Sequence, residues 1–203
     1  MKYAIISGSH RSTSQSIKVS RYLSHVILQS QKDASVEILD LGGNPLPLWD
    51  ESFWSSDPKW DKTWKPFSDK LRAADALVVV SPEWAGMAPA GLKNFFLFCS
   101  KGELAHKPGM IVSVSAGMNG AYPVAELRMT SGKNNQLVYI PDHVIVRTAE
   151  AVLNDLEKPA SPIDESLRKR IHYSLNVLQQ YALAFRQVRE SGVLNLKDYP
   201  FGM

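Results

Sequence analysis

Two hydrophobic patterns alternate along the chain. Short runs of apolar residues, which are typical of buried strands, are separated by segments in which apolar residues recur every three or four positions, as in amphipathic helices. The apolar runs predict strands at 3–7, 36–39, 76–81, 109–115 and 143–146. The helical spacing predicts helices at 14–31, 65–73, 90–100, 120–129 and 164–189. This alternation of strands and helices predicts an α/β fold with a doubly wound parallel sheet.

A small polar loop follows the first apolar run and leads into the first predicted helix. Residues 8–16 read GSHRSTSQS, so several hydroxyl groups and the Arg11 guanidinium surround the start of that helix. Free backbone amides at a helix N-terminus attract anions, and a planar guanidinium matches phosphate oxygens. The loop therefore predicts a phosphate site, whereas the alternative is a plain N-cap that needs one hydroxyl. Neither GxxxxGK[ST] nor GxGxxG occurs there, so the loop is not a Walker or dinucleotide motif.

Two later loops have related chemistry. Residues 82–91 follow the third apolar run and combine small residues with one aromatic, Trp84, while residues 115–121 follow the fourth run and contain two glycines. Small residues let a backbone approach a flat ring, and ligands of open α/β sheets bind at the carboxyl ends of the strands. Alone, the 115–121 loop could equally be a tight strand-to-helix turn. Together, the three loops predict a mononucleotide site.

These three motifs resemble those of the NAD(P)H-dependent FMN reductases, the flavodoxin-like group that includes quinone, azo-dye and chromate reductases. The family pattern is roughly GSxRxxSxN, PEYNGSxPGxLKN and SxGxxGG. Here it reads GSHRSTSQS at 8–16, PEWAGMAPAGLKN at 82–94 and SAGMNGA at 115–121, and the match extends to about residue 145. The resemblance implies a flavodoxin-like three-layer sandwich whose five-stranded parallel sheet has the order 2-1-3-4-5. It also implies FMN as cofactor and NADPH or NADH as co-substrate.

The resemblance assigns each loop a part of the flavin. The phosphate is expected to contact Ser9, Arg11, Ser14, Gln15 and Ser16. One edge of the ring is expected to contact Pro82, Glu83, Trp84, Ala85, Gly86 and Met87. The other edge is expected to face the backbone of Ser115, Ala116, Gly117 and Gly120. We expect Glu83 to accept hydrogen bonds from loop amides, and no side chain to act as acid or base, because the flavin carries the chemistry.

Four positions depart from the family pattern. Trp84 and Ala85 stand where the family has a Tyr–Asn pair, Ser16 replaces an asparagine, and Ala121 replaces a glycine. Tryptophan keeps a flat stacking surface, but alanine removes an amide that could reach the flavin or order the loop. With these departures, the flavin could bind more weakly than in the family or in a different pose.

The resemblance implies an oxidoreductase that passes hydride from NAD(P)H through bound FMN to a quinone, an azo compound, free flavin or a similar small-molecule acceptor. One alternative is a flavin-binding electron carrier or sensor with slow turnover. A second is a family member that has lost flavin and acts as a binding protein. Relatives in this family are commonly oligomers, so a homodimer or homotetramer is expected.

Composition and charge narrow the classes of partner. The 203 residues carry a formal net charge of +3 without a concentrated Lys/Arg block, so nucleic-acid binding has no support. No apolar run is long enough to predict a membrane span, and no signal peptide is recognisable before the first strand. The single cysteine, Cys99, excludes an internal disulfide and a cysteine-clustered metal site, and we expect it in the core. No histidine spacing predicts a metal site. We therefore expect a cytoplasmic protein.

The chain is expected to form a single domain over residues 1–203, with a Trp-rich insertion at about 42–66. This segment holds four of the five tryptophans among several prolines. Loops of such length are commonly lids or interface arms, so one interpretation is a cover over the outer face of the flavin, contributed within one subunit or across a dimer. The alternative is an aromatic cluster that closes the edge of the sheet.

Overall fold

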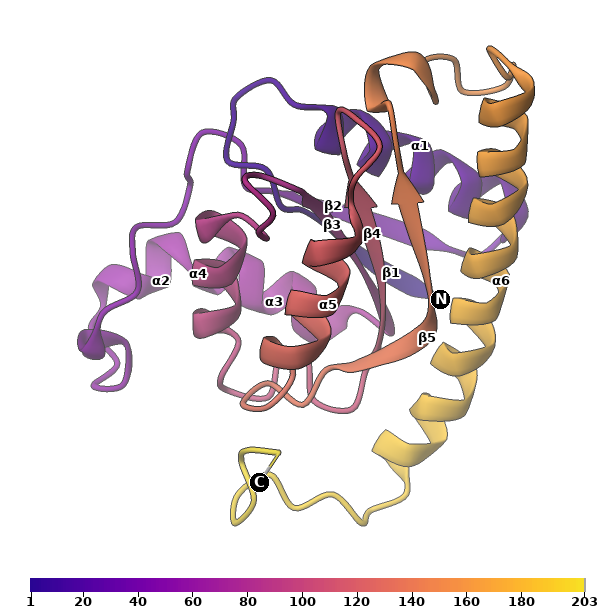
Figure 1. Ribbon diagram of the computed structural model, residues 1–203. Coiled ribbons are helices and arrows are strands. Elements are labelled where there is room, and N and C mark those ends of the chain that lie inside the picture. The colour runs from indigo at the N-terminus through magenta and orange to yellow at the C-terminus, as the bar shows by residue number, and fades with distance from the viewer. Residues whose placement is uncertain (203) are drawn as a thin grey trace.

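The computed structural model describes residues 1–202 and contains one five-stranded parallel sheet. The strand order is β2-β1-β3-β4-β5, which confirms the predicted flavodoxin-like order (Figure 1). The strands are β1 (Lys2–Ser7), β2 (Ser35–Asp40), β3 (Ala76–Pro82), β4 (Pro108–Val114) and β5 (Val138–Val146). Because the order reverses between β1 and β3, the carboxyl ends of these two strands lie side by side at the switch point of the sheet.

Helices cover both faces of the sheet (Figure 1). The α-helices are α1 (Gln15–Ser30), α2 (Lys59–Thr63), α3 (Lys65–Ala73), α4 (Ala90–Phe98), α5 (Ala121–Thr130) and α6 (Pro162–Glu190). Two short 3-10 helices are η1 (Glu51–Phe53) and η2 (Ala149–Ala151). Helices α1 and α6 lie on one face, and the remaining α-helices lie on the other, which gives the predicted three layers. Among the described residues, no helix is both long and apolar enough to cross a bilayer.

The two faces of the sheet are hydrophobic because successive side chains of a strand point in opposite directions. Tyr3 and Ile5 of β1 pack in the core beneath α1 and α6, whereas Ala4 and Ile6 pack in the core beneath α3, α4 and α5. All residues of the central strands β3 and β4 are buried, so both strands read as continuous apolar runs. Cys99 is fully buried in the core beneath α3, α4 and α5, as predicted.

The largest difference from the predicted elements is the start of β5. The strand begins at Val138, five residues before the predicted start at residue 143. It lies at the edge of the sheet, and its first half contains Pro141 and Asp142, which interrupt the apolar pattern. Its pairing with β4 is also irregular between Gly109 and Ile111. An edge strand with one exposed side has a weaker hydrophobic signal than a central one.

The Trp-rich segment packs against α4, on the face of the sheet that α3, α4 and α5 cover. The rings of Phe53, Trp60 and Trp64 lie within 5.0–5.2 Å of the Phe98 ring of α4, measured between centroids, and all three are buried. This packing agrees with the aromatic-cluster alternative. The sequence did not predict the short helices η1 and α2, which place these rings. Trp54 is 71% exposed, so one tryptophan of the segment remains available at the surface.

Candidate functional site

Three loops meet at the carboxyl edge of β1, β3 and β4. The amide of Gly8, directly after β1, donates to the carbonyl of Val80 in β3 at 2.8 Å. The amide of Glu83, directly after β3, donates to the carbonyl of Val114 in β4 at 2.9 Å. Because these bonds continue the pairing of neighbouring strands, the sheet places the 8–16, 82–89 and 115–120 loops next to one another. The structure therefore brings together the three groups of residues that the sequence singled out.

The first loop combines a helix cap with unused polar groups. Ser14 is the N-cap of α1, and its hydroxyl oxygen accepts from the amide of Ile17 at 3.2 Å, as the plain-cap alternative requires. The hydroxyl oxygen of Ser9 accepts from the amide of Arg11 at 3.3 Å. In contrast, the hydroxyl of Ser16 is buried and has no hydrogen-bond partner within the described part of the chain. Buried polar groups are usually paired, so this hydroxyl is a donor that remains available to a further partner.

A cavity of about 360 Å³ lies beside the first loop and the start of α1. Its walls include three of the predicted phosphate contacts and two further cations, together with one carboxylate. The lining residues are Arg11, Thr13, Ser14, Gln15, Ile17, Lys18, Arg21 and Glu150. The cationic surplus and the N-terminus of α1 favour an anion there. The side-chain oxygen of Gln15 is also buried without a partner among residues 1–202.

The second loop is a tight turn with a strained alanine. The amide of Trp84 donates to the carbonyl of Met87 at 3.0 Å, and the reverse bond is 2.9 Å long, so two residues form the turn. Ala85 has φ +48° and Gly86 has φ +73°. Two consecutive left-handed residues suit Asn-Gly, the pair that the family pattern has here, because asparagine tolerates this conformation better than alanine. The turn geometry thus favours a loop-ordering role for the missing amide.

Glu83 and Gly120 join the second and third loops. The amide of Gly120 donates to the Glu83 carboxylate, which confirms the prediction that Glu83 holds loop amides. Gly120 has φ +108°, and a Cβ atom there would lie 2.4 Å from Cγ2 of Ile145. A glycine is therefore required at this junction. The loop is also held from beyond β5, because Nε of Arg147 donates to the carbonyl oxygen of Met118 at 2.6 Å.

Sequence reasoning missed two side chains that hold the second loop. Glu126 of α5 accepts from the amide of Ala88 at 2.6 Å and from Nζ of Lys93 at 3.0 Å. Burial opposes ionisation of Glu126, but these two donors outweigh it and keep the pKa of the carboxyl below its usual value. His10 of the first loop packs edge-on against Trp84, with ring centroids 4.5 Å apart. Both contacts join residues far apart in the sequence, so no local spacing marks them.

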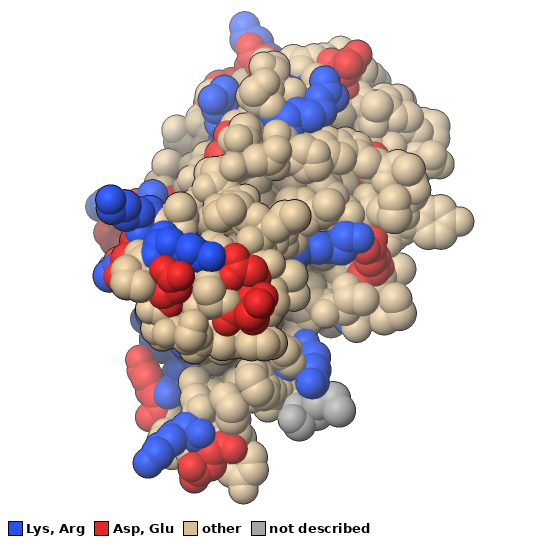
Figure 2. Space-filling model, turned by 90° about the vertical axis from the view of Figure 1, so that its left-hand side faces the viewer, with Lys and Arg blue, Asp and Glu red and all other residues tan. Residues whose placement is uncertain are grey.

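The exposure of the loops suits a flat ligand. Ala85, Met87, Ala116 and Gly117 are exposed, whereas Pro82, Ser115 and Gly120 are buried beneath them. The carboxyl edge of the sheet therefore has exposed loop residues that rest on a buried layer. On the neighbouring face of the molecule, Lys/Arg and Asp/Glu side chains lie beside one another and form no block of one sign (Figure 2). In the described chain, no group of three or more His, Cys, Asp or Glu is placed to hold a metal ion.

The strand order and the layers define a flavodoxin-like class of protein, and comparison with known proteins specifies the family. A family model described as NADPH-dependent FMN reductase matches residues 1–151. The chain is 37% identical over 123 residues to a quinone reductase from Pseudomonas putida strain KT2440, covering 59% of this chain and only 62% of the relative. It is 28% identical over 195 residues to a probable NADPH:quinone oxidoreductase 1 from Oryza sativa subsp. japonica, covering 92% and 94% of the two chains.

A solved structure supports the fold independently. FerB, a flavoenzyme NAD(P)H:(acceptor) oxidoreductase from Paracoccus denitrificans, aligns with a TM-score of 0.71 over 91% of this chain and 98% of its own, at 20% identity. At this identity the likeness shows the shared fold alone. The chain belongs to the NADPH-dependent FMN reductase family, which confirms the resemblance seen in its motifs.

Proposed function

We propose that the chain binds FMN at the carboxyl edge of β1, β3 and β4 and oxidises NADPH or NADH. The observation that carries this proposal is the meeting of all three family loops at one edge, next to a cavity that Arg11, Ser14 and Gln15 line. These residues fit FMN, because a phosphate needs donors and positive charge and an isoalloxazine ring needs exposed backbone and a flat neighbour.

Each loop would have a separate task. Ser9, Arg11 and the amides at the start of α1 would bind the phosphate, with Gln15 and Ser16 completing the donor set. The Trp84–Met87 turn would lie along one edge of the ring, and the 115–120 backbone would face the other edge and favour negative charge on the reduced ring. Bound FMN supplies the hydride chemistry. The side chains Glu83, Glu126 and Arg147 would act at a distance, by fixing the loops.

A quinone, an azo compound or free flavin is the proposed acceptor class. Support comes from relatives named quinone reductase and, at 24% identity over 94% of this chain, NADPH azoreductase from Bacillus sp. strain OY1-2. The test is NADPH consumption by the FMN-loaded protein with 1,4-benzoquinone, with methyl red, and without acceptor. Turnover that depends on an acceptor supports an enzyme. Reduction of the flavin without acceptor turnover would instead favour the electron-carrier alternative.

A homo-oligomer is proposed from the exposed part of the Trp-rich segment. Trp54 and Leu97 are 71% and 56% exposed, and both line a groove of about 870 Å³ next to α4. Exposed aromatic and aliphatic side chains in one groove are typical of subunit contacts. Sedimentation velocity of the wild type and of Trp54→Ser tests this, and a monomeric wild type would contradict it. The cytoplasmic location remains a prediction.

A further inference from the structure

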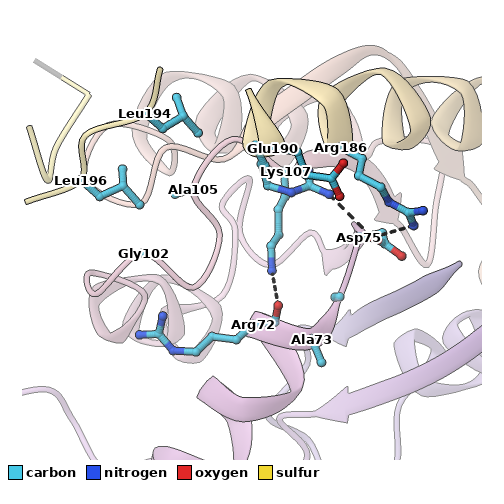
Figure 3. A pocket seen from close by; sticks show the side chains of 12 residues that line it. Arg72, Ala73, Asp75, Gly102, Ala105, Lys107, Arg186, Glu190, Leu194 and Leu196 are labelled. Atoms are coloured by element: carbon cyan, nitrogen blue, oxygen red, sulfur yellow. Dashed lines mark hydrogen bonds and ion pairs between the residues drawn. The ribbon is translucent and has the colours of Figure 1, made fainter. Parts of the chain in front are cut away.

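A second cavity lies at the opposite end of the sheet from the candidate flavin site. It has a volume of about 580 Å³ and lies between the end of α3, the 102–107 loop, the end of α6 and the tail that follows α6 (Figure 3). The tail passes below the amino ends of the strands and returns to the body of the protein (Figure 1), where the amide of Gly202 donates to the carbonyl of Lys133 at 2.7 Å. Leu194 and Leu196 of this tail form one wall.

The walls carry more positive than negative charge. Four basic side chains and two acidic side chains line the cavity, namely Arg72, Lys107, Arg186, Arg189, Asp75 and Glu190. Figure 3 shows that the labelled side chains come from different elements around the cavity, with Arg186 directed towards Asp75 and Lys107 directed towards the carbonyl of Arg72. A concave site with a net positive charge attracts anions.

The single carboxylate at the centre is shared between two guanidinium groups. Asp75 lies 3.0 Å from Nη2 of Arg186 and 3.7 Å from Nη2 of Arg189, and it also accepts from the amide of Lys2 at 2.9 Å. Arg189 also donates from Nη1 to the carbonyl oxygen of His106 at 3.1 Å. Because each guanidinium has five N–H donors in a fixed fork, both arginines retain donors that match phosphate oxygens.

Lys107 adds a buried charge that no carboxylate contacts. Its side chain is almost fully buried, and Nζ donates to the carbonyls of Leu71 and Arg72 at 2.5 and 2.9 Å. These carbonyls end α3, so a structural capping role explains part of its position. Burial and the nearby Arg189 lower the pKa of Lys107 to about 8. An anion in the cavity would offset both effects. Capping by Lys107 does not account for Arg186 and Arg189 at the same cavity, whereas Arg72 is held by the carbonyl of Lys101 and by Glu103.

We propose that this cavity binds a small organic phosphate, with the phosphate between Arg186, Arg189 and Lys107 and the organic part against Leu194 and Leu196. The volume lies within the range of small-molecule sites, about 300–1,000 Å³, and exceeds what an inorganic ion needs. The paired guanidinium groups select phosphate, and the apolar tail selects a ligand with a carbon skeleton or ring. This site is separate from the proposed flavin site and does not depend on it.

Calorimetric titration at pH 7 of the FMN-loaded protein tests the proposal, with AMP as probe, adenosine as the uncharged control and inorganic phosphate as the ring-free control. We expect AMP to bind, inorganic phosphate to bind more weakly, and adenosine not to bind. The double variant Arg186→Gln/Arg189→Gln is expected to lose at least about tenfold in AMP affinity, because charge-assisted bonds are removed. The matched variant Lys169→Gln, which removes a positive charge from the exposed surface of α6, should keep the wild-type AMP affinity.

Two results would overturn the proposal. One is the absence of AMP binding to the wild type up to about 1 mM. The other is loss of AMP binding in Arg11→Gln with retention in the double variant, which would place the nucleotide at the first loop. Since the arginines also hold Asp75, Leu196→Glu provides a second variant at an exposed tail position. It adds a negative charge to the wall and should weaken AMP binding without unfolding the protein; unchanged affinity would contradict the assigned wall.

Discussion

The two edges of the sheet differ in the groups that surround their candidate binding sites. At the carboxyl edge, backbone amides and a few hydroxyls surround the candidate flavin site, and carboxylates such as Glu83 and Glu126 fix the loops from behind. At the amino edge, long basic side chains from α3, α6 and the 102–107 loop line one cavity, and two of them, Arg186 and Arg189 of α6, pair with the carboxylate of Asp75. The first edge depends on backbone shape, and the second depends on the placement of side chains.

This difference explains which site the sequence could reveal. The loops at the carboxyl edge directly follow strands, so each is a continuous motif such as 8–16. The basic cavity combines residues 72, 107 and 186, which are far apart in the sequence and follow no periodic pattern. Backbone sites leave local signatures of glycine and small residues, whereas side-chain sites assembled across a fold do not. Four substitutions test this contrast, from the largest expected effect to the smallest.

Gly120→Ala should damage the carboxyl edge most. The new Cβ would lie 2.4 Å from Cγ2 of Ile145 at a positive φ, so the free energy of unfolding should fall by about 2–5 kcal/mol. Urea denaturation measures this, and FMN titration should show weaker binding. Gly117→Ala is the matched control, because a Cβ at Gly117 meets no atom within 4 Å. Equal stability of the two variants would contradict the backbone account of this edge.

Arg11→Ala should weaken FMN binding by about 1.5–3 kcal/mol, since a charge-assisted hydrogen bond to phosphate is lost. Fluorescence titration of FMN measures the change. Lys169→Ala provides the control, because it removes the same charge from the exposed surface of α6. An FMN affinity that is unchanged in Arg11→Ala would remove this residue from the site.

Asp75→Asn should destabilise the amino edge by about 1–3 kcal/mol at pH 7. Burial opposes ionisation of Asp75, but the hydrogen bonds and charges of Lys2, Arg186 and Arg189 lower its pKa overall. The stabilisation is therefore present above the unfolded pKa and is lost as the pH falls through the folded pKa. Denaturation of both proteins across this range should show the difference shrinking in acid. Asp69→Asn, in an exposed pair with Lys65, should show little effect at any pH.

Ala85→Gly should stabilise the protein by about 0.5–1 kcal/mol. Relief of the left-handed alanine outweighs the added flexibility of the unfolded chain. Thermal denaturation measures the gain. Ala116→Gly is the control, because its φ is not positive and glycine there should cost about 0.5 kcal/mol. Destabilisation by both substitutions would show that Ala85 is not strained.

Much of the fold was predictable because the central strands carry continuous apolar runs. The predicted helix at 65–73 coincides with α3, and the predicted strand at 76–81 is one residue shorter than β3. The start of β5 was missed, because an edge strand with Pro141 lacks that signal. The helices that place Trp60 were also missed, because they are short and owe their position to tertiary packing on Phe98. In the candidate site, the loops were predicted and the contact of His10 with Trp84 was not.

The most direct test of the central claim is a visible absorption spectrum of the protein after FMN addition and desalting, followed by anaerobic addition of NADPH. The account predicts that the flavin band is retained and then bleaches as NADPH reduces the bound ring. A colourless protein after desalting would contradict a flavin site at the carboxyl edge, and it would favour the alternative of a family member that has lost its flavin.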